Sequence, residues 1–264
     1  MIKNLLNLLL ISSFSILISC SSRQEKKSES TYASNEIPYS VKFTLPHDAA
    51  AFTQGLVIHD NKIYESTGRS NSYLAEIDIH SGIILNKVSL GEEYFGEGIT
   101  ILNGKIYQLT WTTNIGFIYD LKTLKSIGTF SYDTEGWGLT TDGSHLIMSD
   151  GSDKLYYLDT LDFKKVKTLH IKENNIPVNR LNELEYHEGK IYANQWETNY
   201  IYKIDPATEK VEGRINLTPL VNEIRRNNPD ANVLNGIAYN ENTGDFLITG
   251  KLWPKSYWIS LKGK

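Results

Sequence analysis

The residues of this sequence that could carry out chemistry occupy equivalent positions in a repeated segment. Five segments share a polar or glycine-rich start, an apolar stretch, a tight turn and a second apolar stretch. Their alignment places five residues at one start position, Gln54, Glu97, Trp137, Asn182 and Asn235, and three at the matching end position, Trp111, Trp196 and Lys251. A carboxyl group, an ammonium group and amides among indole rings could bind a small polar substrate and move a proton on it.

The repeated segment also predicts the strands that position these residues. Turn pairs such as Asn-Gly, Asp-Gly and Glu-Gly accept positive φ, so the two apolar stretches are expected to form a tight hairpin. A third strand follows in every copy and a fourth in the first four copies. Because the unit recurs roughly every 40 to 53 residues, we predict an all-β fold, a five-bladed β-propeller.

Two other segments complete the expected ring. The fifth copy lacks a fourth strand, and residues 39–45 (YSVKFTL) are expected to supply it and close the ring, with His47 holding the closing segment. An insertion at residues 216–233 precedes the fifth copy; its residues 219–226 are expected to form one short helix that covers one rim. Trp253 and Trp258 are interpreted as structural.

The predicted hairpins bring the chemical residues to one mouth of the ring. The start of an inner strand lies beside the end of the next strand, so start and end positions from all five copies meet there, and Phe52 and Phe95 lie two residues before Gln54 and Glu97. Each residue also has a structural interpretation: propeller tryptophans pack between blades, a glutamate is often solvated, and Asn235 precedes a glycine as in turns. Their gathering on one face favours a binding site.

Several classes of function are disfavoured by composition. The formal net charge of −4 leaves no basic footprint for nucleic acid. A single cysteine allows neither an intrachain disulfide nor a thiolate metal site, and the six histidines follow no metal-binding spacing. No phosphate-binding loop, dinucleotide fingerprint or nucleophile elbow is present. We therefore expect no metal and no cofactor.

The first residues are typical of an exported, lipid-anchored protein. A lysine, a short apolar run and the sequence Leu-Ile-Ser-Cys ending at Cys20 resemble the signal and lipobox of bacterial lipoproteins. Residues 1–19 are predicted to be the signal peptide, and residues 20–38 a flexible tether behind lipidated Cys20. Residues 39–264 would form the catalytic domain, held at the cell envelope, on the periplasmic side or in the outer membrane.

The motifs at the predicted mouth resemble one family. PHDAAAFTQGL, YFGEGIT, EGWGL, LNELEY and LNGIAY…TGKLWP, in that order, are similar to glutaminyl-peptide cyclotransferases of the plant and bacterial type, over about residues 39–260. The resemblance implies a five-bladed propeller, in agreement with the repeats. In the fourth copy Glu183 stands in place of the usual glycine.

The resemblance implies a metal-independent enzyme that cyclises the N-terminal glutamine of peptides or proteins to pyroglutamate and releases ammonia. Glu97 would take a proton from the α-amine and return one to the leaving nitrogen, and Lys251 would polarise the amide or stabilise the oxyanion. Asn182 and Gln54 would hold the amide and the amine. Aromatic side chains would pack on the substrate, namely Phe52, Phe95, Trp111, Trp137 and Trp196. We expect a monomer.

Two alternatives remain at this level. A non-enzymatic propeller lipoprotein could bind peptides or glycans through the same aromatic mouth, because a fold does not fix a function. A metal-dependent lactonase or hydrolase would need a ring of oxygen ligands around a cation, but Trp137 occupies one start position and Lys251 repels a cation. We prefer the cyclotransferase.

Overall fold

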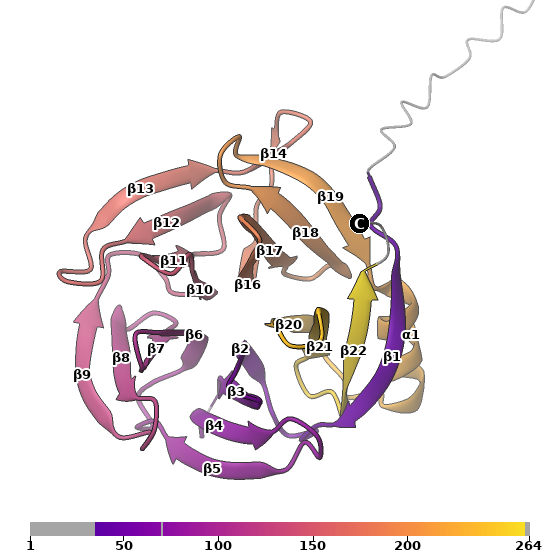
Figure 1. The fold of residues 1–264 in the computed structure, drawn as a ribbon, viewed down its shortest axis with the longest axis horizontal. Coiled ribbons are helices and arrows are strands. Elements are labelled where there is room, and N and C mark those ends of the chain that lie inside the picture. The colour runs from indigo at the N-terminus through magenta and orange to yellow at the C-terminus, as the bar shows by residue number, and fades with distance from the viewer. Residues whose placement is uncertain (1–34, 70, 262–264) are drawn as a thin grey trace, which may run out of the picture. The chain divides into compact units, whose positions relative to one another are not determined.

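The fold is a ring of five antiparallel sheets, as the repeats predict. The structure is a computed structural model that describes residues 35–69 and 71–261. Within this part of the chain, five sheets surround a central axis, with the first strand of each repeat innermost (Figure 1). The predicted five-bladed β-propeller is therefore confirmed. The predicted signal peptide, with Cys20, lies outside the described residues.

The strands follow the repeats closely. Blade one contains β2 (Thr53–His59), β3 (Lys62–Thr67), β4 (Tyr73–Asp78) and β5 (Ile84–Ser89). Blade two contains β6 (Gly96–Leu102), β7 (Lys105–Thr110), β8 (Ile115–Asp120) and β9 (Ser126–Ser131). Blade three contains β10 (Leu139–Thr141), β11 (Leu146–Ser149), β12 (Lys154–Leu158) and β13 (Lys165–His170). Blade four contains β16 (Leu181–His187), β17 (Lys190–Gln195), β18 (Tyr200–Asp205) and β19 (Lys210–Asn216). Blade five contains β20 (Leu234–Asn240), β21 (Asp245–Gly250), β22 (Lys255–Leu261) and β1 (Tyr39–Pro46).

The inner hairpins have the turns that their sequences favour. Asn103 and Gly104 join β6 to β7 with φ of 52° and 72°, and Glu188 and Gly189 join β16 to β17 with φ of 48° and 75°. Two consecutive positive φ angles match the right-handed twist of the flanking strands. These turns fix the register that carries each start and end position to the same face.

The N-terminal strand closes the ring. β1 pairs antiparallel with β22 from Tyr39 opposite Leu261 to Pro46 opposite Lys255, which confirms the predicted outer strand of blade five (Figure 1). His47 Nδ1 donates to Trp253 O at 2.5 Å, and its Nε2 lies 2.9 Å from Glu65 Oε1. The closing segment is therefore joined to blade one as well as to blade five. This covers an edge that would otherwise expose unpaired backbone groups.

Contacts of the propeller begin before β1. Ile37 N donates to Arg214 O at 2.8 Å, and Asn35 Nδ2 donates to Glu212 O. The last residues of the predicted tether segment, residues 20–38, thus lie against β19 of blade four.

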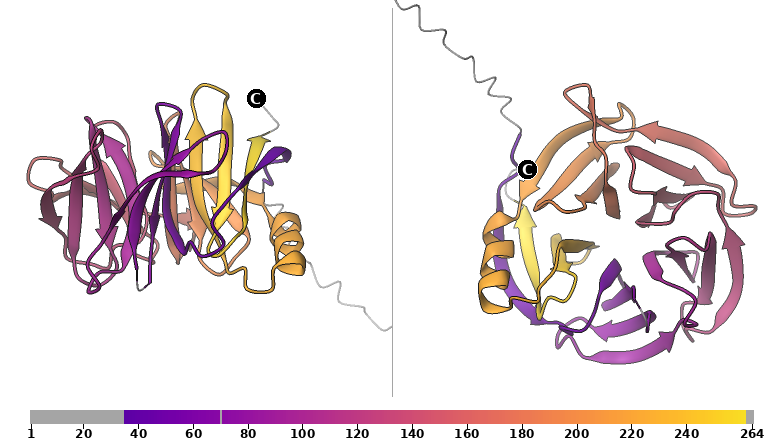
Figure 2. Two further views of the ribbon diagram at one scale, coloured as in Figure 1. Left: turned by 90° about the horizontal axis from the view of Figure 1, so that it is seen from below. Right: turned by 180° about the vertical axis from the view of Figure 1, so that it is seen from behind.

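The predicted helix is α1 (Thr218–Asn227), between β19 and β20. Its buried face, Leu220, Val221 and Ile224, packs in one core cluster with Trp253 and Tyr257 of blade five. Figure 2 shows the helix against the outer side of this blade, near one face of the ring. A short hairpin that the repeats did not predict, β14 (Lys172–Glu173) and β15 (Ile176–Pro177), extends the fourth sheet.

Trp253 and Trp258 are both structural, as predicted. Trp253 is fully buried and donates from Nε1 to Asn232 O, which ties the segment after α1 to blade five. Trp258 is buried under the outer strand, where Phe43 packs on its ring.

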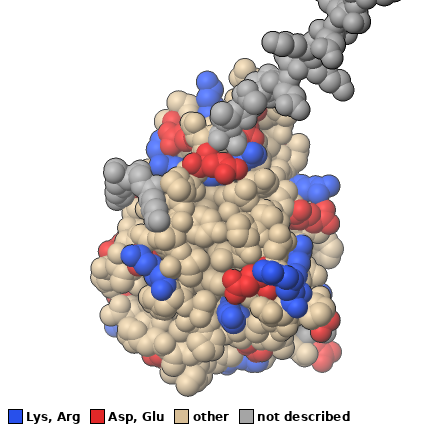
Figure 3. All heavy atoms as spheres, turned by 90° about the vertical axis from the view of Figure 1, so that its right-hand side faces the viewer, with Lys and Arg blue, Asp and Glu red and all other residues tan. Residues whose placement is uncertain are grey.

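The outer surface over blade five carries charges of both signs. Figure 3 shows Lys and Arg side chains interspersed with Asp and Glu side chains on this side, separated by broad uncharged areas. None of the helices within residues 35–69 and 71–261 is long and apolar enough to cross a membrane.

Candidate active site

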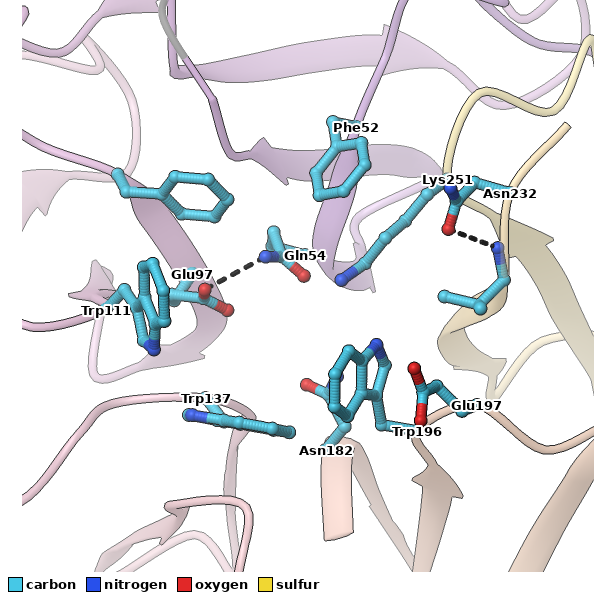
Figure 4. Close-up of a pocket in the computed structure, with 12 residues that line it drawn as sticks. Phe52, Gln54, Glu97, Trp111, Trp137, Asn182, Trp196, Glu197, Asn232 and Lys251 are labelled. Carbon is cyan, nitrogen blue, oxygen red and sulfur yellow. Dashed lines mark hydrogen bonds between the residues drawn. The ribbon is translucent and has the colours of Figure 1, made fainter. Parts of the chain in front are cut away.

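One mouth of the ring holds a cavity of about 420 Å³. The start positions of the inner strands and the end positions of the following strands both open into it (Figure 4). It is lined by Phe52, Gln54, Phe95, Glu97, Trp111, Trp137, Asn182, Trp196, Glu197, Asn232, Val233 and Lys251. The structure therefore brings together in one cavity all the predicted site residues except Asn235.

Asn235 lies behind the cavity wall. Its side chain is buried, and its Nδ2 donates to Gln54 Oε1 at 3.2 Å and to Thr53 O at 3.0 Å. The sequence alignment predicted it as a substrate-binding residue of the mouth because it shares the start position. In the structure it instead holds Gln54 in place, since the amide of Asn235 points back toward blade one.

Glu97 lies on the floor of the cavity and is only 4% exposed. Its Oε1 accepts a hydrogen bond of 2.9 Å from Gln54 Nε2, the dashed contact in Figure 4. Burial raises the pKa of Glu97 well above its ordinary value; Lys251 partly opposes this rise, and Glu135 adds to it. A carboxyl group with a raised pKa can exchange protons near neutral pH, which suits a general base and acid.

Lys251 faces Gln54 and Glu97 across the cavity (Figure 4). It is 5% exposed, and its Nζ lies 4.7 Å from the centre of the Phe52 ring. Burial lowers the pKa of Lys251 to about 8, although Glu97 raises it, and Arg69 lowers it further. The pKa values of both groups are therefore shifted toward the neutral forms. For each group, the loss of hydration on burial outweighs the attraction of the opposite charge.

Asn182 offers the cavity a free acceptor. The residue is buried, and its Oδ1 has no hydrogen-bond partner within the described part of the chain. Its backbone oxygen accepts a bond of 2.7 Å from Ser149 Oγ, which fixes the residue in blade four against blade three. A buried acceptor without a partner is costly unless a ligand or water pairs with it. The side-chain oxygen is thus suited to an N–H group of a bound substrate.

Aromatic side chains form most of the cavity wall. The Phe52 and Phe95 rings pack edge to face with centres 6.2 Å apart, and Phe95 packs in the same way on Trp111 at 5.7 Å. On the opposite wall, the Trp137 and Trp196 rings are perpendicular with centres 5.6 Å apart. Such edge-to-face contacts hold rings at fixed angles. The walls can therefore restrict the conformation of a flexible ligand.

Two glycines at end positions make room for these rings. A Cβ on Gly151, which has φ of 80°, would lie 2.6 Å from Trp137 Cζ2, and a Cβ on Gly68 would lie 2.1 Å from Phe95 Cε1. The end positions that hold tryptophan or lysine in other blades are glycine here because an aromatic ring lies over each of them, Phe95 over Gly68 and Trp137 over Gly151.

Glu135 is a residue of the site that the sequence analysis missed. Its Oε2 accepts hydrogen bonds from both Trp111 Nε1 and Trp137 Nε1, at 2.8 and 2.9 Å. One carboxylate thus fixes two indole rings from different blades. The available signal was that tryptophan N–H groups in a wall need acceptors, and Glu135 lies two residues before Trp137.

The other missed residues line the outer part of the cavity. Glu197 accepts a hydrogen bond of 2.6 Å from Arg180 Nη1 at the exposed rim. Asn232 and Val233 come from the segment after α1, which the alignment treated as an insertion outside the repeat. Because a repeat alignment compares only equivalent positions, it could not assign residues that only one blade supplies.

The donor groups of the site do not resemble a metal centre. In residues 35–69 and 71–261, no group of three or more His, Cys, Asp or Glu side chains is arranged to hold a metal ion. The carboxyl group of Glu97 instead shares its surroundings with an amide and an amine. The site is thus suited to hydrogen bonding and proton transfer.

The chain is similar to known proteins of one family. The profile of a family described as glutamine cyclotransferase matches residues 12–261. A protein from Arabidopsis thaliana named glutaminyl-peptide cyclotransferase is 38% identical over 232 residues, which are 86% of this chain and 72% of that protein. The crystal structure of Myxococcus xanthus glutaminyl cyclase has a TM-score of 0.81 and 35% identity, and the match covers 86% of this chain and 98% of that chain. The chain therefore belongs to the glutamine cyclotransferase family.

Proposed function

We propose that the protein is a glutaminyl-peptide cyclotransferase, which converts the N-terminal glutamine of peptides or proteins to pyroglutamate and releases ammonia without a metal ion. Family membership and the name of the Arabidopsis relative support this activity. The observation that carries the proposal is the buried carboxyl group of Glu97, which lies on the floor of an aromatic cavity beside Gln54 and Lys251.

The reaction requires two proton transfers at neighbouring atoms. The α-amine nitrogen attacks the side-chain amide carbon and loses a proton as the new C–N bond forms. The former amide C–N bond then breaks, and its nitrogen must gain a proton to leave as ammonia. Ionised Glu97 takes the first proton and returns it to the leaving nitrogen, so one residue serves both steps. Its raised pKa makes its carboxylate a stronger base than a carboxylate in water.

The polar neighbours of Glu97 have separate roles. Gln54 Nε2 holds one oxygen of the carboxyl group, so the other oxygen is free to face the substrate. Lys251 carries the positive charge that stabilises the oxyanion formed on attack. Asn182 Oδ1 accepts an N–H of the substrate and orients its amine or amide.

The aromatic walls favour the folded form of the substrate. A glutamine side chain must bend back so that its amide carbon meets its own α-amine. The edge-to-face rings on both walls favour a compact ligand over an extended one. Ordering an intramolecular attack in this way is a large part of what such a site contributes to the rate.

A simple assay tests the activity. The purified protein, incubated with a Gln-initiated dipeptide and an excess of chelator, is expected to release ammonia and form a pyroglutamyl product. Gln at the second position of a dipeptide is the matched control and should not react. A folded protein that binds the dipeptide without releasing ammonia would instead support the peptide- or glycan-binding alternative.

We also propose that the protein is anchored at the cell envelope through lipidated Cys20, by the signal in its first residues. Expression of the full chain with a radiolabelled fatty acid in a bacterial host is expected to label the protein, whereas Cys20→Ser should remove the label. Equal labelling of both forms would exclude this anchor.

A further inference from the structure

A buried carboxylate spans three blades beneath the cavity. Glu183 of β16 is fully buried on the axis. Its Oε1 accepts a hydrogen bond of 3.1 Å from Leu56 N in blade one, and its Oε2 accepts one of 2.7 Å from Ile237 N in blade five. The other four repeats have glycine at this position, namely Gly55, Gly98, Gly138 and Gly236.

The glycines explain why only one blade carries a side chain here. A Cβ on Gly98 would lie 2.4 Å from Leu139 N, and one on Gly55 would lie 2.5 Å from Ile99 N. Blades one to three thus meet through bare backbone near the axis. Blade four contacts blades five and one through a side chain instead: the two carboxyl oxygens of Glu183 accept hydrogen bonds from the backbone of β20 and β2.

Both contacts of Glu183 lie close to polar residues, one that lines the cavity and one behind its wall. Leu56 follows Gln54 by two residues on β2, and Ile237 follows Asn235 by two residues on β20. The carboxylate therefore fixes the two strand starts from which these amides project.

A chain of hydrogen bonds continues from these strand starts to the cavity floor. Asn235 Nδ2 donates to Gln54 Oε1 at 3.2 Å, and Gln54 Nε2 donates to Glu97 Oε1 at 2.9 Å. The orientation of the Gln54 amide is fixed at both ends, because its oxygen and nitrogen have different partners. The position of the Glu97 carboxyl group thus depends on the alignment of β2 with β20.

We infer that Glu183 is a positioning residue of this site: by holding the backbone of β2 and β20 together, it orients Gln54 and thereby the carboxyl group of Glu97. Its kinetic consequences rest on the proposed cyclotransferase activity. Glu183 itself touches no substrate, since it lies below the residues that line the cavity.

The role requires two acceptor oxygens on one side chain. Two backbone N–H donors need two acceptors, and the carboxyl group of Glu183 supplies both, although burial and the neighbouring Glu185 raise its pKa well above the ordinary value. An amide at this position would satisfy one N–H and point its own NH₂ group at the other. Glu183→Gln is therefore nearly the same size but breaks one link, either to blade one or to blade five.

Glu185 provides a matched control on the same strand. Its Oε1 accepts a hydrogen bond of 2.9 Å from Tyr239 N, and no hydrogen bond of its side chain reaches blade one among the described residues. Glu185→Gln also removes a carboxyl group with a raised pKa, which burial brings to about 8. It therefore reproduces the chemical change of Glu183→Gln without touching the strand that carries Gln54.

The experiment compares these two variants by the titration of Glu97 and by turnover of a Gln-initiated dipeptide. The Gln54 hydrogen bond favours the ionised form of Glu97, so loosening it in Glu183→Gln should raise the pKa of Glu97, read from carboxyl carbon-13 NMR without substrate. The kcat should fall by about 10- to 100-fold, since a small misplacement of a reacting group has this effect, while KM changes little. Glu185→Gln should leave the pKa of Glu97 unchanged and the kcat within about twofold of the wild-type value.

Two results would overturn the inference. A folded Glu183→Gln protein with the wild-type titration of Glu97 and the wild-type kcat would limit Glu183 to stability. If that variant does not fold, Asn235→Ala removes the next link while keeping both bonds of Glu183. An unchanged Glu97 titration in Asn235→Ala would then exclude the proposed chain. A wild-type protein without turnover would disprove only the proposed activity. The titration of Glu97 in the variants would still test the hydrogen-bonded connection from Glu183 to Glu97.

Discussion

At the scale of single residues, the site contains two buried ionisable groups that are both shifted toward neutrality. Glu97 and Lys251 occupy one cavity, and burial is the largest cause of the pKa shift of each. A surface pair would keep both charges in water. Here burial in the same cavity weakens the preference of each group for its charged form. This leads to two predictions, one for the activity of Glu97 and one for the stability cost of Lys251.

The first prediction concerns the proposed proton carrier. Glu97→Gln keeps the size of the side chain but cannot accept a proton from the substrate amine. The rate of ammonia release should fall by about 10²- to 10⁴-fold, the usual contribution of a general base and acid. The melting temperature should not fall, because a neutral amide suits a buried site. Retained turnover in a folded variant would remove Glu97 from the mechanism.

The second prediction concerns the stability cost of Lys251. Burial lowers the pKa of Lys251 from 10.5 to about 8, so the unfolded chain binds this proton more tightly than the native one. The resulting destabilisation is fully present below pH 8 and disappears as the pH rises from about 8 to 10.5. Lys251→Met should therefore raise the free energy of unfolding by roughly 3 kcal/mol at pH 6. Ammonia release should fall, because the charge proposed to stabilise the oxyanion is lost.

Urea unfolding of the wild type and Lys251→Met at pH 6 and near pH 10.5 measures this effect. The gain should fall to a small fraction of its value at the higher pH, where the lysine is neutral in the native state and only half protonated in the unfolded state. A variant that is less stable than the wild type at pH 6 would contradict the assignment of an unfavourable buried charge.

At the scale of elements, the loops that end the second strands decide which rings can enter the cavity. Gly151 follows β11 with φ of 80°, and the Trp137 ring lies directly over it. Trp137 lies just before the short strand β10, and its backbone N–H donates to Ser149 O at 3.0 Å while its backbone oxygen accepts from Gly98 N at 2.7 Å. The position of the indole ring depends on Gly151 below it, on Glu135 at its N–H and on the perpendicular Trp196 ring.

Gly151→Ala tests this dependence. The new Cβ would meet Trp137 Cζ2 at 2.6 Å, so the indole must move and KM for a Gln-initiated dipeptide should rise, by about tenfold. Gly143→Ala is a suitable control, because Gly143 has φ of 88° and nothing within 4 Å of its Cβ position. Both substitutions place alanine at a positive φ, which should destabilise each variant by roughly 1 to 2 kcal/mol. Thermal unfolding measures this shared loss of stability. Equal KM values for both would show that Trp137 does not shape the site.

At the scale of the whole molecule, the propeller completes its site within one chain. Blades one to five each contribute to the mouth or to its support, and β1 closes the ring by pairing with β22. Closure by one additional strand leaves the innermost strands fixed at the axis, where Glu183 joins three blades.

We therefore predict that the monomer is the active species. A protein that begins at residue 35 should have the mass of one chain by light scattering, and its specific activity should not change on dilution. Activity that falls as the concentration is lowered would indicate that a second chain contributes to the site.

Much of this arrangement could be predicted from the sequence. The start positions repeat with Gln54, Glu97 and Asn182 in equivalent places, and the turn pairs specify the hairpins, so the five blades and the composition of the mouth follow from periodicity. The closing strand follows too, because a blade with three strands leaves an open edge.

Only the tertiary structure decided the direction of each side chain at the axis. Asn235 shares the start position of Glu97 yet turns behind the wall, and Glu135, outside the aligned positions, joins two indoles from different blades. Glu183 interrupts the glycine pattern, but its bonds to two other blades depend on how closely the inner strands approach. Local sequence encodes the strand and its register. Burial, and with it the pKa of Glu97 and Lys251, arises only when five distant segments exclude water together.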